Sequence, residues 1–440
     1  MKKIILFLIV CISLILPTSH ANAQVTNDDT NVELARMFSK DIFDLNGVPY
    51  MKPMIESINA TSNSRFFNQA YVPKSVKKPY FRIGIHAMAG FVSDDQKTYN
   101  PAMPMEEMSY EGLKRYGEIY YDSNGVGFKI LDEAGLIYYA IKTIIYDGVN
   151  YGAEVDGEHQ YIPVPDQAAT VLGNMKQAFV LDRDLMRVLI ENNELYKLLP
   201  EETKNLILDN ITSFPEYFTL PQGANMNTLL AAIPQFEIGS LYGTELLLRF
   251  IPPVDMGEEI GDFAFWGIGL KHSLSQYFFN DPGVNAEYYE RPFDLAFQVV
   301  YQGTSLENFI GVTNAKLVAN ATFWDFNIHA SKNFFEWLDV YSGLSLELFD
   351  VVADYTYKIP VETQLQLGLM RLDSATNEII ADPENGYPGD NKPQTTSMSM
   401  NDMNFKWIIG LSANIGPVAI FMDYNLSKFS IFTGGIQYRF

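Results

Sequence analysis

The sequence predicts an all-β protein: a transmembrane antiparallel β-barrel with an even number of strands, ten to fourteen. Three observations predict it. Apolar and polar residues alternate with the period of two that a β-strand imposes, in one segment after another of the second half. Aromatic residues make up 14% of the chain and charged residues only 19%, which suits aromatic rows at two lipid–water boundaries. No stretch after residue 23 has the roughly 18 apolar residues of a spanning helix.

The last eleven residues, 430–440, form the clearest strand. One face carries the apolar members Phe432, Ile436, Tyr438 and Phe440, and Thr433, Gly435, Gln437 and Arg439 lie between them. The pattern resembles the closing strand of bacterial outer-membrane barrels, in which the terminal aromatic residue is the assembly signal. That resemblance implies the barrel-assembly machinery as a partner. The alternative is an ordinary edge strand that ends in Phe.

The first 23 residues predict a cleaved signal peptide. Lys2 and Lys3 precede an apolar run, and Ala21-Asn22-Ala23 follows as a cleavage site, so we expect the mature chain to begin at Gln24. The single cysteine, Cys11, lies within the run. A net charge of −22 argues against nucleic acid as a partner. The expected location is the bacterial outer membrane, with outer-membrane lipid and lipopolysaccharide as neighbours.

Eight strands are expected in the second half of the chain, and the first half adds at least two. The eight are 235–251, 263–279, 293–303, 315–331, 337–357, 404–415, 417–427 and 430–440. Residues 81–91 and 136–146 have the same alternation, and 112–132 has room for two more strands. Within 315–331 the apolar positions change phase between Ala321 and Trp324, which predicts a β-bulge.

Two segments do not follow the strand pattern. Apolar residues recur at helical spacing in 28–45, at the start of an N-terminal segment, 24–79, that is either a periplasmic tail or a plug. Helical patterns recur in a partly helical insertion, 160–232. With the C-terminus placed in the periplasm, the strand count puts this insertion on the periplasmic side and 358–403 in an outer loop. Residues 80–440, the insertion included, form the barrel.

Charged residues on the inward faces of the strands are the best candidates for a functional site. Glu237, Glu245 and Arg249 share one face of 235–251, and Lys271 faces the lumen from the next segment. Charged side chains inside a membrane protein are paired or wetted. These four therefore predict either a constriction that gates a ligand or a salt-bridged lumen that only makes the barrel rigid.

Other chemistry is sparse. The sequence after residue 23 has no motif for a zinc protease, a nucleotide-binding loop or a serine hydrolase, and we expect no cofactor and no metal. Four histidines remain, His86, His159, His272 and His329, none at metal-ligand spacing. His272 is expected on the lipid-facing side without a partnered serine. Three outer-loop carboxylates, Asp382, Glu384 and Asp390, predict either a cation site that bridges lipopolysaccharide or a solvated loop.

A family resemblance rests on the run from Pro234 to Leu274. It includes Pro234-Gln235-Phe236-Glu237-Ile238-Gly239, Gly243-Thr244-Glu245-Leu246 and Gly267-Ile268-Gly269-Leu270. The run resembles an uncharacterised family of exported outer-membrane β-barrel proteins from Bacteroidetes-type bacteria. The layout is also similar to that of the outer-membrane long-chain fatty acid transporters. The resemblance implies a barrel without an assigned activity.

Three hypotheses for function follow. The first is a channel or transporter for small molecules, hydrophobic ones included, with an unknown solute. The second is a structural or adhesion barrel with a sealed lumen. The third is a barrel enzyme such as a phospholipase, which requires a nucleophile and a base close together; we expect no enzyme.

Overall fold

The computed structural model describes residues 28–62, 66–74, 76, 78–122, 125–214, 216–220, 223, 225–255, 262–279, 291–310, 315–359, 361–366 and 368–440. The predicted signal peptide and the expected mature start at Gln24 lie outside these residues. Every helix within them is too short or too polar to cross a membrane.

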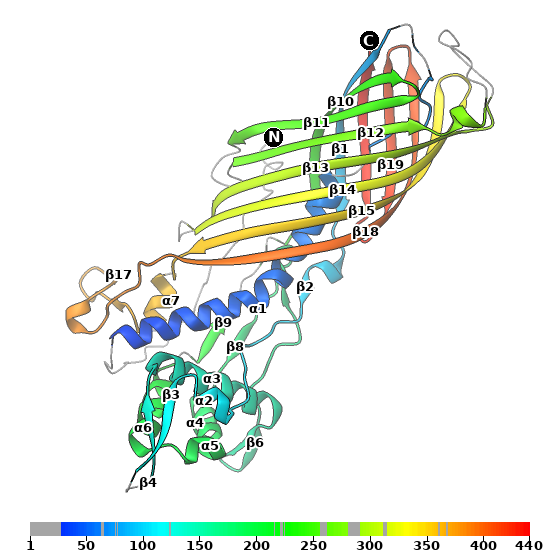
Figure 1. The fold of residues 1–440 in the computed structure, drawn as a ribbon. Coiled ribbons are helices and arrows are strands. Elements are labelled where there is room, and N and C mark those ends of the chain that lie inside the picture. The colour runs from blue at the N-terminus through cyan, green and yellow to red at the C-terminus, as the bar shows by residue number, and fades with distance from the viewer. Residues whose placement is uncertain are drawn as a thin grey trace.

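Ten antiparallel strands form one closed barrel, and the first strand pairs with the last (Figure 1). The strands are β1 (Tyr80–Phe91), β10 (Thr228–Leu241), β11 (Thr244–Asp255), β12 (Asp262–Ser273), β13 (Asp294–Ile310), β14 (Ala315–Phe334), β15 (Leu338–Tyr357), β18 (Gln394–Ile415), β19 (Val418–Leu426) and β20 (Ile431–Arg439). The predicted fold class and an even strand number between ten and fourteen are confirmed.

The expected single strand 235–251 is wrong, because the chain turns back within it. Tyr242 and Gly243 both have positive φ, +49° and +74°, and form the two-residue turn between β10 and β11. A turn of two residues by itself exchanges even and odd positions between the two faces, but a register shift in β10 between Gly239 and Leu241 adds one residue and restores the phase. The apolar set therefore stays in phase across the hairpin, and the sequence pattern hides the turn.

Two other expected strand segments lie outside the barrel. Residues 136–146 are not a strand but part of helix α3 (Glu133–Asn150), which begins where the Asp132 side chain accepts a hydrogen bond from the Gly135 amide. The helix is buried on nearly all sides, so apolar residues fall at every spacing and a period of two appears by coincidence. Residues 112–132 contain β3 (Gly117–Asp122) and β4 (Gly125–Ile130), a hairpin that pairs only with itself.

The predicted β-bulge in 315–331 is also wrong. β14 keeps an unbroken register with both neighbours over its 20 residues. The phase changes because the two faces of the wall exchange polarity. Beyond Trp324, towards the start of β14, the exposed outward positions are Thr322 and Asn320, whereas Phe323 and Ala321 face inward onto apolar side chains.

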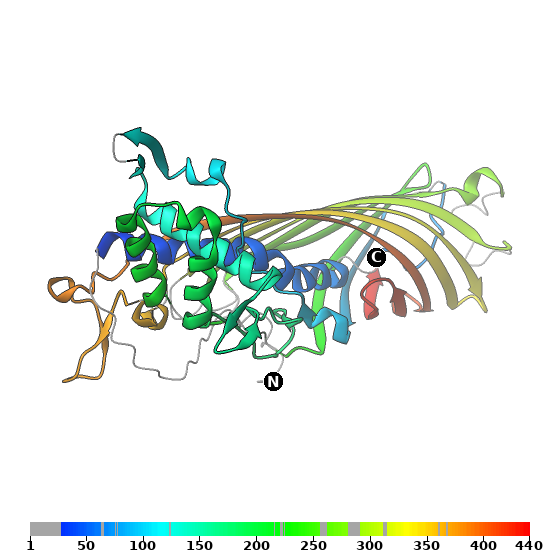
Figure 2. The ribbon, with the colours of Figure 1, turned by 90° about the horizontal axis from the view of Figure 1, so that it is seen from below.

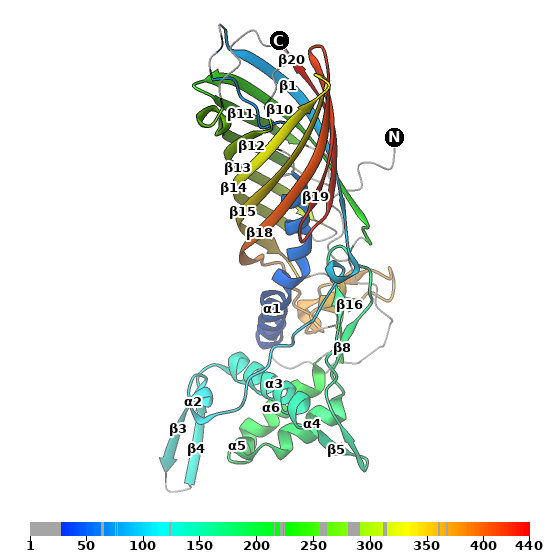
Figure 3. The ribbon, with the colours of Figure 1, turned by 90° about the vertical axis from the view of Figure 1, so that its right-hand side faces the viewer.

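The large insertion of this protein spans 92–227, more than the expected 160–232, and connects β1 to β10. It lies at the end of the barrel opposite the C-terminus, not on the side of the C-terminus (Figure 3). The misread hairpin shifted the count by one strand and so reversed the side. Besides α3, β3 and β4 it contains η1 (Asp94–Gln96), β2 (Thr98–Tyr99), α2 (Tyr110–Leu113), β5 (Ala153–Val155), β6 (Glu158–Gln160), β7 (Ala168–Ala169), β8 (Ala178–Val180), α4 (Arg183–Asn192), α5 (Glu194–Lys197), α6 (Glu201–Ser213) and β9 (Tyr217–Thr219).

A 35-residue helix, α1 (Asp28–Ser62), joins the insertion to the barrel (Figures 1 and 2). It is longer than the expected 28–45 and includes Pro49 and Pro53. Near its start, Leu34 and Phe38 pack in the core of the insertion, and further on Ile55 packs inside the barrel. The loop 358–393, shorter than the expected 358–403 because β18 begins at Gln394, lies beside the first part of α1. It holds α7 (Val361–Gln366), β16 (Arg371–Leu372), β17 (Ile379–Ile380) and η3 (Pro383–Asn385), and η2 (Ser275–Tyr277) follows β12.

Arg36 on α1 and Asp390 in this loop form an ion pair, with 2.7 Å between Nε and Oδ2. Burial of the carboxyl opposes ionisation, but the hydrogen bonds from Arg36 and from the Lys392 amide outweigh it and lower the pKa of Asp390. A carboxyl with a lowered pKa in the folded state stabilises fully above its ordinary pKa, near about 4, and the stabilisation is lost as the pH falls through the lowered value.

We therefore expect amide exchange around Asp390 to accelerate only below about pH 4, after correction for the intrinsic rates. The measurement is hydrogen–deuterium exchange of the 389–392 amides between pH 6 and pH 3. In the Arg36→Gln variant these amides should exchange fast already at pH 6. Equal protection in both proteins would show that this ion pair does not hold the loop.

Candidate functional site: a charged lumen closed by the chain itself

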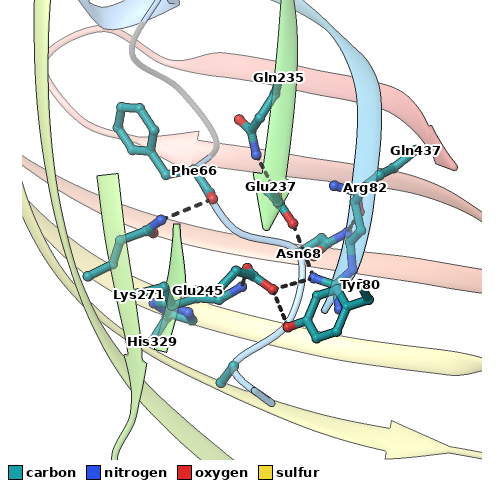
Figure 4. Close-up of polar contacts among 12 residues, drawn as sticks. Phe66, Asn68, Tyr80, Arg82, Gln235, Glu237, Glu245, Lys271, His329 and Gln437 are labelled. Carbon is teal, nitrogen blue, oxygen red and sulfur yellow. Dashed lines mark hydrogen bonds and ion pairs between the residues drawn. The ribbon is translucent and has the colours of Figure 1, made fainter. Parts of the chain in front are cut away.

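Three buried polar side chains meet around Glu245 on the inner wall of the barrel (Figure 4). Glu245 accepts hydrogen bonds from the Tyr80 hydroxyl at 2.6 Å and from Arg82 at 2.9 Å. Its other oxygen lies 2.5 Å from Nζ of Lys271. The register places them together, because Glu245 pairs with Lys271 across β11 and β12. None of the four is more than 5% exposed, so these charges are compensated by one another.

The network continues onto β10. Arg82 also contacts Glu237 at 3.1 Å, and the Gln235 amide donates to Glu237 at 2.6 Å. Gln235 in turn accepts from Nε of Arg249 at 2.9 Å. The Arg249 guanidinium lies 4.4 Å from the ring centre of Phe66, which belongs to the N-terminal segment. A cation of the wall thus faces an aromatic ring of the chain inside it.

A second buried network lies on β14, β15 and β18. Lys406 pairs with Glu347 at 2.5 Å, and the Asn404 amide donates to the same carboxylate at 2.7 Å. Asp325 accepts hydrogen bonds from Ser345 and from Asn327. Nδ1 of His329 lies 2.8 Å from Oδ1 of Asn327. Both networks face the barrel interior, where an open pore would hold water.

Residues 66–74 occupy that interior and are fixed to the wall on several sides; we call this segment the plug. The Phe67 ring stacks on His329 at 3.8 Å between ring centres. Backbone and side-chain bonds add to this contact. Gln298 donates to the Phe66 carbonyl (3.4 Å), Asn68 donates to Gln437 (2.9 Å), and the Ala70 amide donates to Ser331 (2.8 Å). Just before the plug, Lys406 donates to the Ala60 carbonyl (3.2 Å).

The plug itself is buried, which shows that it fills the space it crosses. Phe66 and Phe67 are each 2% exposed, and Ala70 and Val72 are buried as well. Its contacts reach β11, β13, β14, β15 and β20, which lie on different sides of the ring. Near the end of the plug, the Pro73 carbonyl accepts a hydrogen bond from Ser240, which lies at the end of β10. The N-terminal segment therefore runs through the barrel before β1 begins.

The structure brings the four predicted lumen residues into one connected network: Glu237 and Glu245 contact Arg82, and Lys271 contacts Glu245. Arg249 joins this network through Gln235 and also contacts Phe66. Sequence reasoning missed Arg82, Glu347 and Asp325 as site residues. Alternation was a usable signal for all three: Arg82 lies between Phe81 and Ile83, Asp325 between Trp324 and Phe326, and Glu347 between Leu346 and Leu348. No pattern signals the plug contacts, because they join segments far apart in sequence.

The predicted assembly-signal residues Phe432, Ile436, Tyr438 and Phe440 all lie exposed on the outward face at the barrel's closing seam. The Phe440 ring stacks on Phe81 of β1 at 5.7 Å. His272 also faces outward, and its ring nitrogens contact Thr244, Tyr277 and Gln276 rather than a serine.

The loop carboxylates do not form a cation site among the residues that the structure describes. Asp382 bonds to Arg371 at 2.6 Å and to Asn385, whereas Asp390 bonds to Arg36. No group of three or more His, Cys, Asp or Glu in the described ranges has the arrangement of a metal site. Asp382 and Asp390 instead hold the loop through these bonds.

These observations define a class of protein: a closed ten-stranded antiparallel β-barrel whose lumen is occupied by its own N-terminal segment. Over residues 1–440 the chain matches the model of a family of unknown function, DUF6588, and it belongs to that family. No curated protein matches it in sequence. Among solved structures it is similar to Ail, the attachment invasion locus protein of Yersinia pestis. The identity is 11% and the TM-score 0.20, over 45% of this chain and 95% of that one. A likeness at this level supports no inference.

Proposed function

We propose that the barrel lies in a bacterial outer membrane. Two aromatic rows on its outward face support this. One row joins Trp266, Tyr301 and Trp324 on three neighbouring strands, with 5.4 and 4.5 Å between successive ring centres. The other joins Phe236, Phe81 and Phe440, with 5.9 and 5.7 Å between successive ring centres. Exposed apolar residues such as Ile85, Leu346 and Ile409 lie on the outward faces between the two levels. Such a band is what lipid requires of a barrel.

A pair of arginine substitutions tests this band. Leu346→Arg places a charge between the aromatic rows and is expected to cost about 2–4 kcal/mol, which lowers the amount of assembled barrel in the membrane. Asn401→Arg places the same charge on β18 beyond the outer row, where the outward face is polar, and should leave assembly unchanged. The measurement is the folded fraction in outer-membrane extracts. Equal assembly of the two variants would argue against the proposed band.

We further propose that the protein is a sealed barrel that displays the 92–227 body at the cell surface, where that body contacts a partner. The closed lumen carries this proposal: the plug is buried and bonded to strands around the ring. With the C-terminus in the periplasm, as is general for bacterial barrels, the body and the loop 358–393 face outward. Planar-bilayer conductance tests the proposal, and a silent barrel is the expected result.

A second candidate is a gated channel or transporter for small molecules, hydrophobic ones included. One observation favours it: the wall behind the plug carries charged side chains, among them Arg249, Lys271 and Lys406, which would line a wet pore if the plug moved aside. The expected likeness to the fatty acid transporters and the origin in Bacteroidetes-type bacteria stay predictions. Conductance that appears only after loss of the plug distinguishes a plugged pore from a barrel that is sealed by its wall alone.

A further inference from the structure

The upper part of β18 has a free edge. β18 pairs with β15 from Gln394 to Ala413, but with β19 only from Trp407 onward. Among the described residues, no other strand pairs with 394–406 on that side. Alternate residues along such an edge present an unpaired amide and carbonyl to the side, which is a template for another strand.

Several of the usual blocks to pairing are missing from this edge. Residues 394–405 contain no proline, lysine or arginine, and the register with β15 shows no bulge. The other place where the wall separates gives a contrast. The pairing of β10 with β11 ends at Gln235 and Arg249. The unpaired parts of the two strands contain Pro234, Pro252 and Pro253, which lack amide donors.

A groove lies along the free edge. Its volume is about 300 Å³, and it is lined on one side by Lys40, Phe43, Asp44 and Val48 of α1 and on the other by the consecutive residues 395–399 of β18. Consecutive residues point alternately in and out, so a groove that touches all five runs along the strand's edge and not over one face. Thr396 donates to the Asp44 carboxylate, which fixes the helix beside the strand. A strand edge facing a helix is the geometry in which an extended peptide adds to a sheet.

We propose that this groove binds an extended peptide segment of a partner protein, which pairs with β18 through its main chain. The five lining residues span about 17 Å, enough for a segment of about five residues. Phe43, Val48 and Met398 offer apolar contact to one side chain of the peptide. The inference rests on the proposed surface-displaying barrel, since it names the chemistry of that barrel's partner.

A second copy of this chain does not fit the site. Two barrels in one membrane are related by rotation about the membrane normal, so both β18 strands descend in the same direction. With strands tilted by about 35–45°, the two edges would cross and not align. The groove also lies beyond the outer aromatic row, where the outward residues Ser397, Ser399 and Asn401 are polar and exposed, so lipid is not its occupant.

The test uses the full-length protein in detergent and a positional-scanning library of acetylated hexapeptides, with binding read by fluorescence anisotropy. We expect members with β-branched residues to bind, and N-methylation of alternate amides in the best binder to weaken binding by about tenfold or more, because it removes donors to the edge. N-methylation of the other amides should have little effect.

Val48→Trp fills the groove and is expected to abolish binding, while Leu45→Trp, on the exposed side of the same helix, should bind as the parent does. Binding that ignores both Val48→Trp and N-methylation would overturn the proposal, as would a library without a single binder. Conductance recorded on the same samples tests the sealed barrel separately. If the barrel does not conduct and no peptide binds, the sealed barrel stands and only the peptide-binding site is rejected.

Discussion

Deletion of residues Asn31–Pro79 is expected to turn a silent barrel into a conducting one. The segment contributes the plug, and its removal leaves an interior lined by the Glu245 and Glu347 networks, which water would then fill. Full-length protein in planar bilayers should give no steps, and the deletion variant should give discrete steps. Because the surviving wall carries both signs of charge, we expect the steps to depend on ionic strength.

A cross-linked variant supplies the control for this deletion. The Ala70 amide lies 2.8 Å from Oγ of Ser331, so Ala70→Cys with Ser331→Cys joins the plug to β14 through a disulfide. The predicted mature chain has no other cysteine. This variant should stay silent when oxidised. Steps in full-length protein that disappear on oxidation would support the gated channel instead, whereas silence of the deletion variant would show that the strands alone close the lumen.

The second large effect is expected from Glu245. It contacts Lys271, Arg82 and Tyr80 in a site from which solvent is excluded, so Glu245→Ala leaves two buried cations with less compensation. Removal of one member of a buried ion pair costs about 3–5 kcal/mol. Denaturant titration of the folded protein in detergent, with folded and unfolded forms separated by gel mobility, measures the loss.

Two further variants make that result interpretable. Glu245→Leu combined with Lys271→Met removes both charges of the central pair and should recover a large part of the loss, because the strong penalty comes from an uncompensated charge. Glu307→Ala removes one member of a half-exposed ion pair with Lys316 in the same barrel, and should cost no more than about 1 kcal/mol. If Glu245→Ala matched Glu307→Ala, the lumen network would not contribute to stability.

Local alternation was enough to predict the barrel and the inward direction of Glu237, Glu245, Arg249 and Lys271, since strand faces are set by neighbours in sequence. It failed where two structures share one pattern. The Tyr242-Gly243 turn and the extra residue of β10 beside it together keep the apolar positions in phase, so the hairpin looks like one continuous strand, and the all-round burial of α3 looks like alternation. Such ambiguities are settled by tertiary contacts, which a single sequence does not display.

The apparent bulge in 315–331 has a different cause. An inward face was expected to be polar throughout, but Ala319 and Ala321 face the apolar residues Phe43 and Ile55 of α1. Whether a lumen-facing position carries a polar or an apolar residue therefore depends on contacts with a segment more than 250 residues earlier in the chain. The partners of the lumen charges inside the plug, such as Phe66 for Arg249, were beyond prediction for the same reason.

The path of the N-terminal segment also constrains how the molecule assembles. β1 starts at the C-terminal end of the barrel, whereas α1 extends out of the opposite end. A helix about 10 Å across, with a folded body packed on its far part, is a poor candidate for end-first passage through a finished ring. The pairing of β1 with β20 is then the step that locks the segment in place. Because β20 is the last of the barrel strands along the chain, the ring closes only when β20 reaches β1, and the closed ring then encloses residues 66–74 of its own polypeptide.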